Sequence, residues 1–348
     1  MDDWGRIILN LRLCGIPYIY GWLKQAKEAL LPPSPPYRYK GPPKCPGGGT
    51  LKITSECVPC LIKRSVYETR LVGGDEGKAI SAALGALSRH YSPDKCSAAV
   101  ATLMHRAVYD TLGSEDPYRE LKDKANTVAR SLLPRARELM EGSKDRLKAA
   151  VTCAIMGNVM DFGIEGSFEG PEALGAEFER LFREGMGHDD VDRARGWLRP
   201  GARVVYFFDN CGELYFDTLL LGELRSMGVS VTAVAKGAPI LTDVTREDAR
   251  AAGIEDLVDR LVDTGVFAVG MDLDCMPPEL SGALDGADLI VSKGMANYEA
   301  MSERDMGPVL HLMRTKCGSV SHSLGLPRNL SVAVLVGARN NGSIDPGK

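Results

Sequence analysis

Acidic and amide side chains follow a short apolar run near the middle of the chain. Residues 204–208 are all apolar and rich in β-branched and aromatic types, which is typical of a strand buried on both faces of a parallel sheet. Asp209 and Asn210 come directly after it, followed by Gly212 and Glu213. Ligands of open α/β sheets bind outside the carboxyl ends of the strands. We therefore expect this segment to hold a divalent metal ion and, through it, a phosphate group. Capping of the following helix is the alternative.

A second acidic residue follows the next predicted strand. Residues 229–235 form that strand, and Asp243 lies just before a helix that we expect to begin at Thr245. Neighbouring parallel strands bring their loops together, so Asp209, Asn210 and Asp243 are expected to converge. Two carboxylates and an amide oxygen suit Mg²⁺ or Mn²⁺, whereas a zinc site more often uses His or Cys. Taken alone, Asp243 also fits an ordinary turn residue.

A third segment at a strand end carries groups that suit phosphate or hydroxyl oxygens. It follows the predicted strand at 288–291 and contains Lys293 and Asn297, with Gly294 permitting close approach of the backbone to a ligand. Glu299 lies in the same segment and is included among the candidate substrate-binding residues. A solvated surface lysine is the alternative for Lys293.

Two further segments supply candidate residues. Lys316 is placed to neutralise charge on a transferring phosphoryl group, unless it is an ordinary exposed lysine. Asn158 and Asp161 are three residues apart and share a face if they lie on a helix. Flanked by glycines, they are expected to close the site from the helical part of the chain, with a simple helix C-cap as the alternative.

The periodicity of the chain changes at about residue 200. Before it, apolar residues recur at helical spacing; after it, short apolar runs alternate with helices in the βαβ rhythm of a parallel sheet. We predict an α/β fold, a Rossmann-like, doubly wound and mostly parallel sheet with an N-terminal all-helical domain. The predicted strands are 204–208, 229–235, 266–269, 289–291 and 332–336, with 308–313 ambiguous. The predicted divisions are an extension and Pro/Gly-rich linker at 1–52, a helical domain at 53–199, a catalytic domain at 200–340 and a tail at 341–348.

Composition narrows the class of protein. The 348 residues carry a net charge of −4, so no global basic field favours nucleic acid as a partner. No apolar run approaches the roughly 20 residues of a membrane helix. Nine cysteines in a chain of this length favour free thiols in a reducing cytoplasm. The oligomeric state is left open.

One cysteine pair stands apart from the rest. Cys57 and Cys60 are three residues apart and share a helical face. They are a candidate for a second metal site or a redox site, but a single CxxC without a second pair also fits an unliganded structural pair. The five histidines show no ligand spacing.

These motifs together resemble the metal-dependent damage-control phosphatases, the family of the ARMT-like domain, over roughly residues 53–336. The resemblance rests on DN-x-GE at 209–213, PILTDVT, GNVMDFG, KGMANYE and RTKC, and the CxxC resembles the prokaryotic and archaeal branch. It implies a helical domain packed on a Rossmann-like domain and hydrolysis of small phosphate esters, such as sugar phosphates or phosphopantetheine-like metabolites. It also implies metal ligation by Asp209, Asn210 and Asp243. Lys316 would contact the phosphate, and Asn297 would lie on the substrate side.

One position departs from the sugar-phosphate branch of that family. Cys317 follows Lys316 where that branch tends to have Ala-Asp, so the resemblance leaves the substrate open.

The resulting hypothesis is a metal-dependent phosphohydrolase with one divalent cation, Mn, Mg, Co or Ni, and a small-molecule phosphate ester as its partner. Water attack is expected, with Glu213 a candidate base. Attack by Asp209 to give an aspartyl-phosphate is the mechanistic alternative. Two rival functions are an S-adenosylmethionine-dependent carboxyl methyltransferase and a non-catalytic metal-binding scaffold. The sequence argues against the methyltransferase, because the first strand of the α/β part is followed by DNCGE rather than by a GxGxG loop.

Overall fold

The computed structural model describes residues 51–159, 171–302 and 305–337. The predicted tail and nearly all of the predicted extension lie outside these ranges. The chain divides into two compact units, 1–43 and 44–348, and every described residue belongs to the second. None of the described helices is both long enough and apolar enough to cross a membrane.

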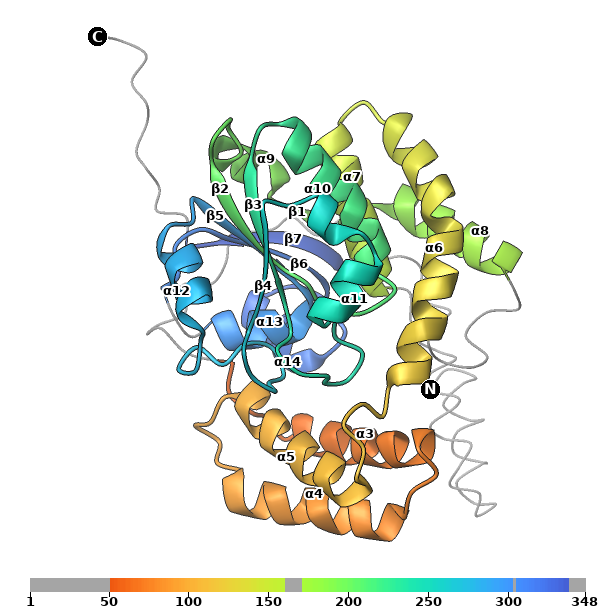
Figure 1. Ribbon diagram of the computed structural model, residues 1–348, viewed down its shortest axis with the longest axis vertical. Helices are drawn as coiled ribbons and strands as arrows, with labels where there is room; N and C mark the ends of the chain where they lie inside the picture. Colours follow the sequence, from red (N-terminus) through yellow and green to blue (C-terminus); the bar gives the residue numbers. More distant parts are fainter. Residues whose placement is uncertain (1–50, 160–170, 303–304, 338–348) are drawn as a thin grey trace, which may run out of the picture. The chain divides into compact units, whose positions relative to one another are not determined.

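Helices fill the described chain up to residue 184, as the periodicity predicts (Figure 1). Local signals set several of their ends: the Asp75 carboxylate accepts a hydrogen bond from the backbone N of Lys78 at 3.1 Å and caps one helix. Gly113, with φ 63°, ends the next. The helices are α3 (Cys57–Leu71), α4 (Glu76–His90), α5 (Ser97–Leu112), α6 (Arg119–Glu141), α7 (Arg146–Val159) and α8 (Pro171–Glu184).

The sheet has seven strands in the order β1-β7-β6-β5-β2-β3-β4. All neighbours are parallel except β6 and β7, which confirms the predicted mostly parallel α/β fold. The strands are β1 (His188–Asp189), β2 (Arg203–Phe207), β3 (Ser230–Ala235), β4 (Arg260–Asp263), β5 (Leu289–Lys293), β6 (Val309–Arg314) and β7 (Ser331–Val336).

Two predictions of local structure are wrong. The predicted strand at 266–269 is a loop, because Arg260–Asp263 takes the place beside β3 and Gly265, at φ 73°, turns the chain away. In the predicted helical domain, residues 189–198 form a short strand and short helical pieces instead of a regular helix, since β1 pairs with β7 there. One strand of the sheet, β1, therefore lies within the segment predicted to be helical. The domain boundary at 199/200 stays a prediction. The pieces are α9 (Val191–Ala194) and the 3₁₀ helix η1 (Arg195–Trp197).

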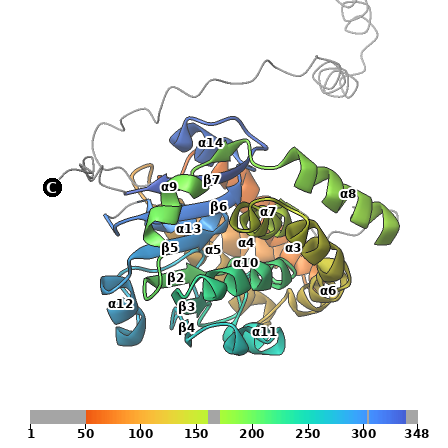
Figure 2. The ribbon, with the colours of Figure 1, turned by 90° about the horizontal axis from the view of Figure 1, so that it is seen from above.

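The two faces of the sheet are covered by different helices, as Figure 2 shows. Strand alternation sends Val204 and Tyr206 into a core shared with α6, α7, α8 and α10, while Val205 and Phe207 pack against α12. The remaining elements are α10 (Leu214–Ser226), α11 (Arg246–Ala251), the 3₁₀ helix η2 (Ile254–Asp256), α12 (Pro278–Asp285), α13 (Gly294–Met301) and α14 (Gly318–Leu324).

The carboxylate of Asp190 links the end of the edge strand β1 to β7. Its carboxylate accepts hydrogen bonds from Leu335 N at 3.0 Å and Arg193 at 2.9 Å, and lies 3.1 Å from His188 Nε2. Burial opposes ionisation, but these partners outweigh it and lower the pKa to about 2.

Because folding lowers the pKa of Asp190, its ionised form stabilises the protein at pH values above the unfolded pKa near 4. This stabilisation is lost as the pH falls toward 2. Asp190→Asn should therefore cost about 1–2 kcal/mol at pH 7 and less at pH 3, measured by urea unfolding. An equal cost at both pH values would contradict this.

The order of the strands indicates where a ligand is expected to bind. The chain runs from β2 outward through β3 to β4, then returns to β5 on the other side of β2. The carboxyl ends of β2 and β5 therefore lie at a topological switch point, the usual ligand position in open α/β sheets. The segments that begin at Asp209 and Lys293 both leave the sheet there.

Candidate active site

Backbone pairing brings the two predicted acidic loops together. Val244 N donates to Asp209 O at 2.8 Å, and Cys211 N donates to Thr242 O at 2.7 Å. Asn210 and Asp243 form a β-bridge between these bonds. The predicted convergence of Asp209, Asn210 and Asp243 thus has its physical basis in a short hydrogen-bonded pairing of the segments after β2 and β3.

Asp209 is buried among amide donors. Its Oδ2 accepts hydrogen bonds from Nδ2 of Asn158 and Nδ2 of Asn210, both at 2.7 Å. Asn210 turns its Oδ1 toward the Thr242 hydroxyl at 2.6 Å. Asn158, on α7, therefore reaches the site as predicted. Asp161 lies outside the described residues.

Gly294 is required where α13 begins. A Cβ on this residue would lie 1.9 Å from Asp209 Oδ2, and the backbone φ of 76° is a conformation that glycine adopts most readily. The absence of a side chain lets the Asp209 carboxylate pack against the backbone of α13, so the group that closely approaches Gly294 is a side chain of the protein. The expected approach to a ligand stays a prediction.

Gly294→Ala should therefore destabilise the protein by about 2–4 kcal/mol, from steric overlap and backbone strain together, as measured by urea unfolding. Gly282→Ala in α12 is the matched control, because its Cβ would meet no atom within 4 Å. The control should be neutral or stabilising by up to about 1 kcal/mol. Equal stability of the two variants would contradict the close packing of Asp209 on Gly294.

A buried ion-pair network lies behind the acidic loops. Lys293 Nζ is 2.9 Å from Glu213 Oε2 and 2.7 Å from Asp217 Oδ1, and all three side chains are at most 1% exposed. Asp217 also accepts from the Tyr206 hydroxyl at 2.8 Å. Alternation along β5 explains the position of Lys293: it points to the same face as Leu289 and Val291, which is the face that α10 covers.

The pKa values in this network follow from burial and charge. Burial opposes the ionised form of Lys293, but Asp217 and Glu213 outweigh it and raise the lysine pKa. Burial likewise opposes ionised Glu213, yet Lys293 and hydrogen bonds from Asn210 lower the pKa of Glu213. Asp217 has fewer donors, so burial raises its pKa to about 6.

These contacts bear on two of the predicted roles. Lys293 Nζ is held by two carboxylates rather than presented toward a ligand. The lowered pKa of Glu213 makes it a weak base, and its oxygens already accept from Asn158, Asn210 and Lys293, so the arrangement disfavours a general base. The geometry is that of residues that position the Asp209 loop.

A second lysine, which the sequence analysis did not single out, lies beside Asp243. Lys236 follows β3 and is 4% exposed. Its Nζ is 3.3 Å from Asp243 Oδ2, which makes no well-directed hydrogen bond, and it donates to Asn297 Oδ1 at 3.3 Å and to Gly270 O. Asn297 in turn donates to the carbonyls of Phe208 and Lys293 at 2.9 Å each. Asn297 therefore joins α13 to the end of β2.

The surroundings of Asp209 and Asp243 disfavour the ionised form of both carboxyl groups. Burial raises the pKa of Asp209, and the nearby charges of Glu213 and Asp243 raise it further. Burial also raises the pKa of Asp243, opposed by Lys236. In both residues the ionised form is therefore disfavoured, a cost that a nearby positive charge would offset.

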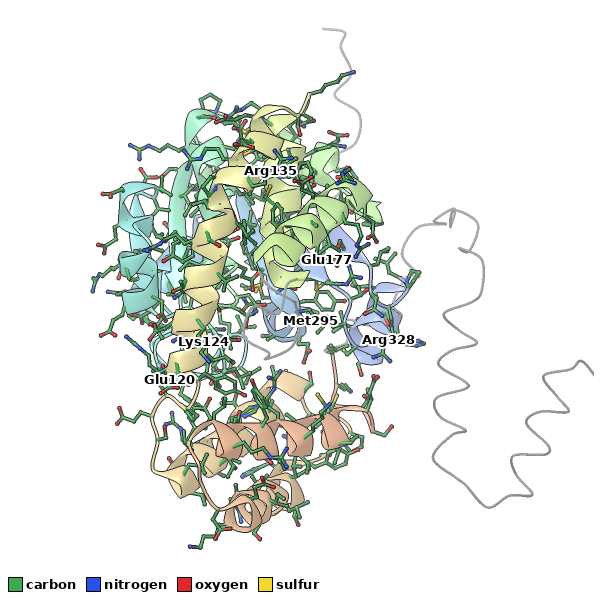
Figure 3. All side chains as sticks on the ribbon, turned by 90° about the vertical axis from the view of Figure 1, so that its right-hand side faces the viewer. Glu120, Lys124, Arg135, Glu177, Met295 and Arg328 are labelled. Carbon is green, nitrogen blue, oxygen red and sulfur yellow. The ribbon has the colours of Figure 1, made fainter. Side chains whose placement is uncertain are left out.

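The remaining phosphate candidates lie elsewhere or at the edge. Lys316 is exposed, and its backbone N lies 3.3 Å from Met295 Sδ while its carbonyl accepts from Arg328 at 3.1 Å. Met295 and Arg328 are labelled in Figure 3. Glu299 points to α5, where its carboxylate accepts from the Ser97 hydroxyl. The structure thus brings Met295, beside Gly294, to the Lys316 loop, and directs Glu299 away from Asp209.

The CxxC pair lies at the start of α3. Cys57 is half-buried, with its Sγ 3.4 Å from the Thr54 hydroxyl, and Cys60 is exposed. In the described part of the chain, no three His, Cys, Asp or Glu side chains are grouped as metal ligands. Asp209, Asn210 and Asp243 contain only two residues of those four types, because Asn210 carries an amide, so that criterion does not cover them.

The residues missed in the sequence had weak signals. Asp217 lies in α10, four residues after Glu213, a spacing that places both side chains on one helix face. In the sequence alone, however, Asp217 is indistinguishable from an ordinary polar residue of that helix. Lys236 comes directly after a strand, the same signal that identified Asp209. Applying that rule to every strand end would have found it.

Comparison with known proteins gives the family. The damage-control phosphatase ARMT1-like domain matches residues 53–332. A damage-control phosphatase of Archaeoglobus fulgidus is 41% identical over 82% of this chain and all of its own length. A damage-control phosphatase of Pyrococcus horikoshii is 30% identical over 82% of this chain and 98% of its own.

A solved structure confirms the fold. The crystal structure of a DUF89 family protein from Pyrococcus horikoshii superposes with a TM-score of 0.74 at 29% identity, covering 81% of this chain and 98% of that one. With a seven-stranded sheet whose acidic loops meet at the switch point, and with a domain match spanning residues 53–332, this chain belongs to the damage-control phosphatase family with the ARMT1-like domain.

Proposed function

We propose that this protein is a divalent-metal-dependent phosphatase that hydrolyses small phosphate monoesters, in keeping with relatives named damage-control phosphatases. The observation that carries the metal dependence is the meeting of two buried carboxylates, Asp209 and Asp243, at the switch point of the sheet. Family membership supports the phosphatase class.

The residues present fit a divalent cation, which we propose to be Mn²⁺, Mg²⁺, Co²⁺ or Ni²⁺. Asp209 and Asp243 supply two carboxylates whose mutual repulsion a cation would relieve, and Asp243 Oδ2 lacks a well-directed hydrogen bond. Asn210 would bind through Oδ1, which must turn from the Thr242 hydroxyl. The oxygen-only donor set suits Mg²⁺ and Mn²⁺ best among these metals.

A bound cation would neutralise charge on a phosphoryl oxygen and activate a water molecule. The chain's own residues then have distinct tasks. Asn158 and Glu213 hold Asp209 and Asn210 in place, and Lys293 keeps Glu213 charged. Lys316 remains the proposed phosphate contact, because its side chain is exposed and its backbone N contacts Met295, the residue after Gly294.

The test is a screen of small phosphate monoesters, including sugar phosphates and phosphopantetheine, with each of the four metals. The proposal expects phosphate release that needs the metal and stops with EDTA. Trapped aspartyl-phosphate would assign the attack to Asp209 instead of water. Turnover that survives EDTA and requires S-adenosylmethionine would favour the methyltransferase rival. Binding of metal without hydrolysis of any ester would favour a scaffold.

A further inference from the structure

Helix α5 contacts the segments that carry the site, although it contributes none of the proposed metal ligands. In Figure 1, α5 lies at the end of the sheet where α13 and α14 are found. It forms hydrogen bonds with the loop after β3, the loop after β4 and helix α13, through Tyr109, Thr102 and Ser97 respectively. Each of these three segments touches Asp243, Lys236 or Gly294, or carries one of them.

The contact of Tyr109 reaches an unusual backbone conformation. Leu241 N donates to the Tyr109 hydroxyl at 3.0 Å, and Leu241 has φ 49°, a region that non-glycine residues seldom occupy. Asp243 follows two residues later, and its N donates to Ile240 O at 3.1 Å to close the turn. Tyr109 is 3% exposed, so its hydroxyl replaces water as the partner of a backbone group that the turn leaves free.

Aromatic packing fixes the ring of Tyr109. It meets Phe267 edge-on, with centroids 5.4 Å apart and planes at 75°. The guanidinium of Arg106 lies 3.8 Å from the Phe267 centroid on the same ring. Tyr109 and Arg106, both on α5, therefore hold the loop after β4 while Tyr109 also holds the loop after β3.

Thr102 extends the contact to the lysine beside Asp243. Val269 N donates to the Thr102 hydroxyl at 2.9 Å, and the next residue, Gly270, accepts from Lys236 Nζ through its carbonyl. Lys236 in turn lies 3.3 Å from Asp243 Oδ2. Gly270 also packs on α13, since a Cβ there would lie 2.3 Å from Ala296 O.

We propose that α5 positions the site, with Tyr109 as the main positioning residue for Asp243 and Thr102 as that for Lys236. This inference rests on the proposed function only where it concerns metal affinity. Without Tyr109 Oη, the N–H of Leu241 loses its buried partner and the turn that presents Asp243 opens more often. The carboxylate is then held less well for a cation.

The test compares Tyr109→Phe with Tyr118→Phe in the full chain. Tyr118 is the control: it is fully buried, and its hydroxyl donates to Glu68 at 3.3 Å rather than bonding the backbone of the loop after β3. Hydrogen–deuterium exchange of peptides spanning 236–245 should be about tenfold faster in Tyr109→Phe and near wild type in Tyr118→Phe. The Mn²⁺ dissociation constant, by calorimetry, should rise about tenfold in Tyr109→Phe alone. Thr102→Val should speed exchange at 266–271, and Thr102→Ser should restore it.

The outcomes separate this inference from the proposed function. Equal exchange and equal Mn²⁺ affinity in the two tyrosine variants would overturn it, as would faster exchange in Tyr109→Phe with unchanged affinity. If the wild-type protein binds no Mn²⁺ and cleaves no ester, the proposed function fails, and the exchange comparison alone still decides whether α5 fixes the loops.

Discussion

Replacing Asp209 with asparagine should lower metal-dependent ester hydrolysis by at least about 10³-fold, because a carboxylate ligand of the proposed cation is lost. Asp243→Asn should have a similar effect, and the double variant should be little worse than either, since the two residues act on one ion. Initial rates at saturating Mn²⁺ measure this directly. Asp190→Asn, at the far edge strand, is the control and should keep wild-type activity.

The same substitutions should stabilise the metal-free protein. Folding raises the pKa of Asp209 by burial and by the charges of Glu213 and Asp243, so its ionised form costs stability at neutral pH. A neutral amide of the same shape removes that cost, and a gain of about 1 kcal/mol in urea unfolding without metal is expected. Loss of activity together with lower apo-protein stability would contradict the account, because it would show a purely structural role for Asp209.

Lys293→Met should be the most destabilising single change in the site, costing about 3–5 kcal/mol in urea unfolding. It leaves the carboxylates of Glu213 and Asp217 buried without their cation. The expected pH dependence has a definite sign. Without the lysine, folding raises the pKa of both acids, so the variant should regain stability as pH falls from 7 to 5 and the acids become protonated.

Neutralising the partners provides the control for that prediction. The triple variant Lys293→Met with Glu213→Gln and Asp217→Asn should recover much of the lost stability, since no uncompensated charge remains. If Lys293→Met alone were as stable as the wild type at pH 7, Lys293 would not be the buried counter-ion of this network.

The meeting of the proposed metal ligands was predictable because the ends of strands can be identified in a sequence. The apolar run before Asp209 identifies a buried strand, and the parallel arrangement then places Asp243 nearby without further information. Gly294 was also predictable as a point of close approach. The structure adds what that approach serves, which is the packing of Asp209.

The direction of side chains was harder to predict. Lys293 ends β5 and Lys236 directly follows β3. Whether a lysine at such a position faces a ligand or a buried carboxylate depends on which face of the sheet it points to and on which helix covers that face. Position in the chain gives neither. The wrong prediction of a strand at 266–269 has a similar cause. These apolar residues belong to a loop that packs against α5, and an apolar run alone does not distinguish a buried loop from a strand.

The central claim is that Asp209 and Asp243 share one divalent cation. The most direct measurement is anomalous diffraction at the manganese edge from crystals of the protein grown with Mn²⁺. The account predicts a single strong peak within coordinating distance, roughly 2.0–2.4 Å, of a carboxylate oxygen of each residue. A peak that contacts only one of them, or bound Mn²⁺ found only elsewhere in the protein, would contradict it.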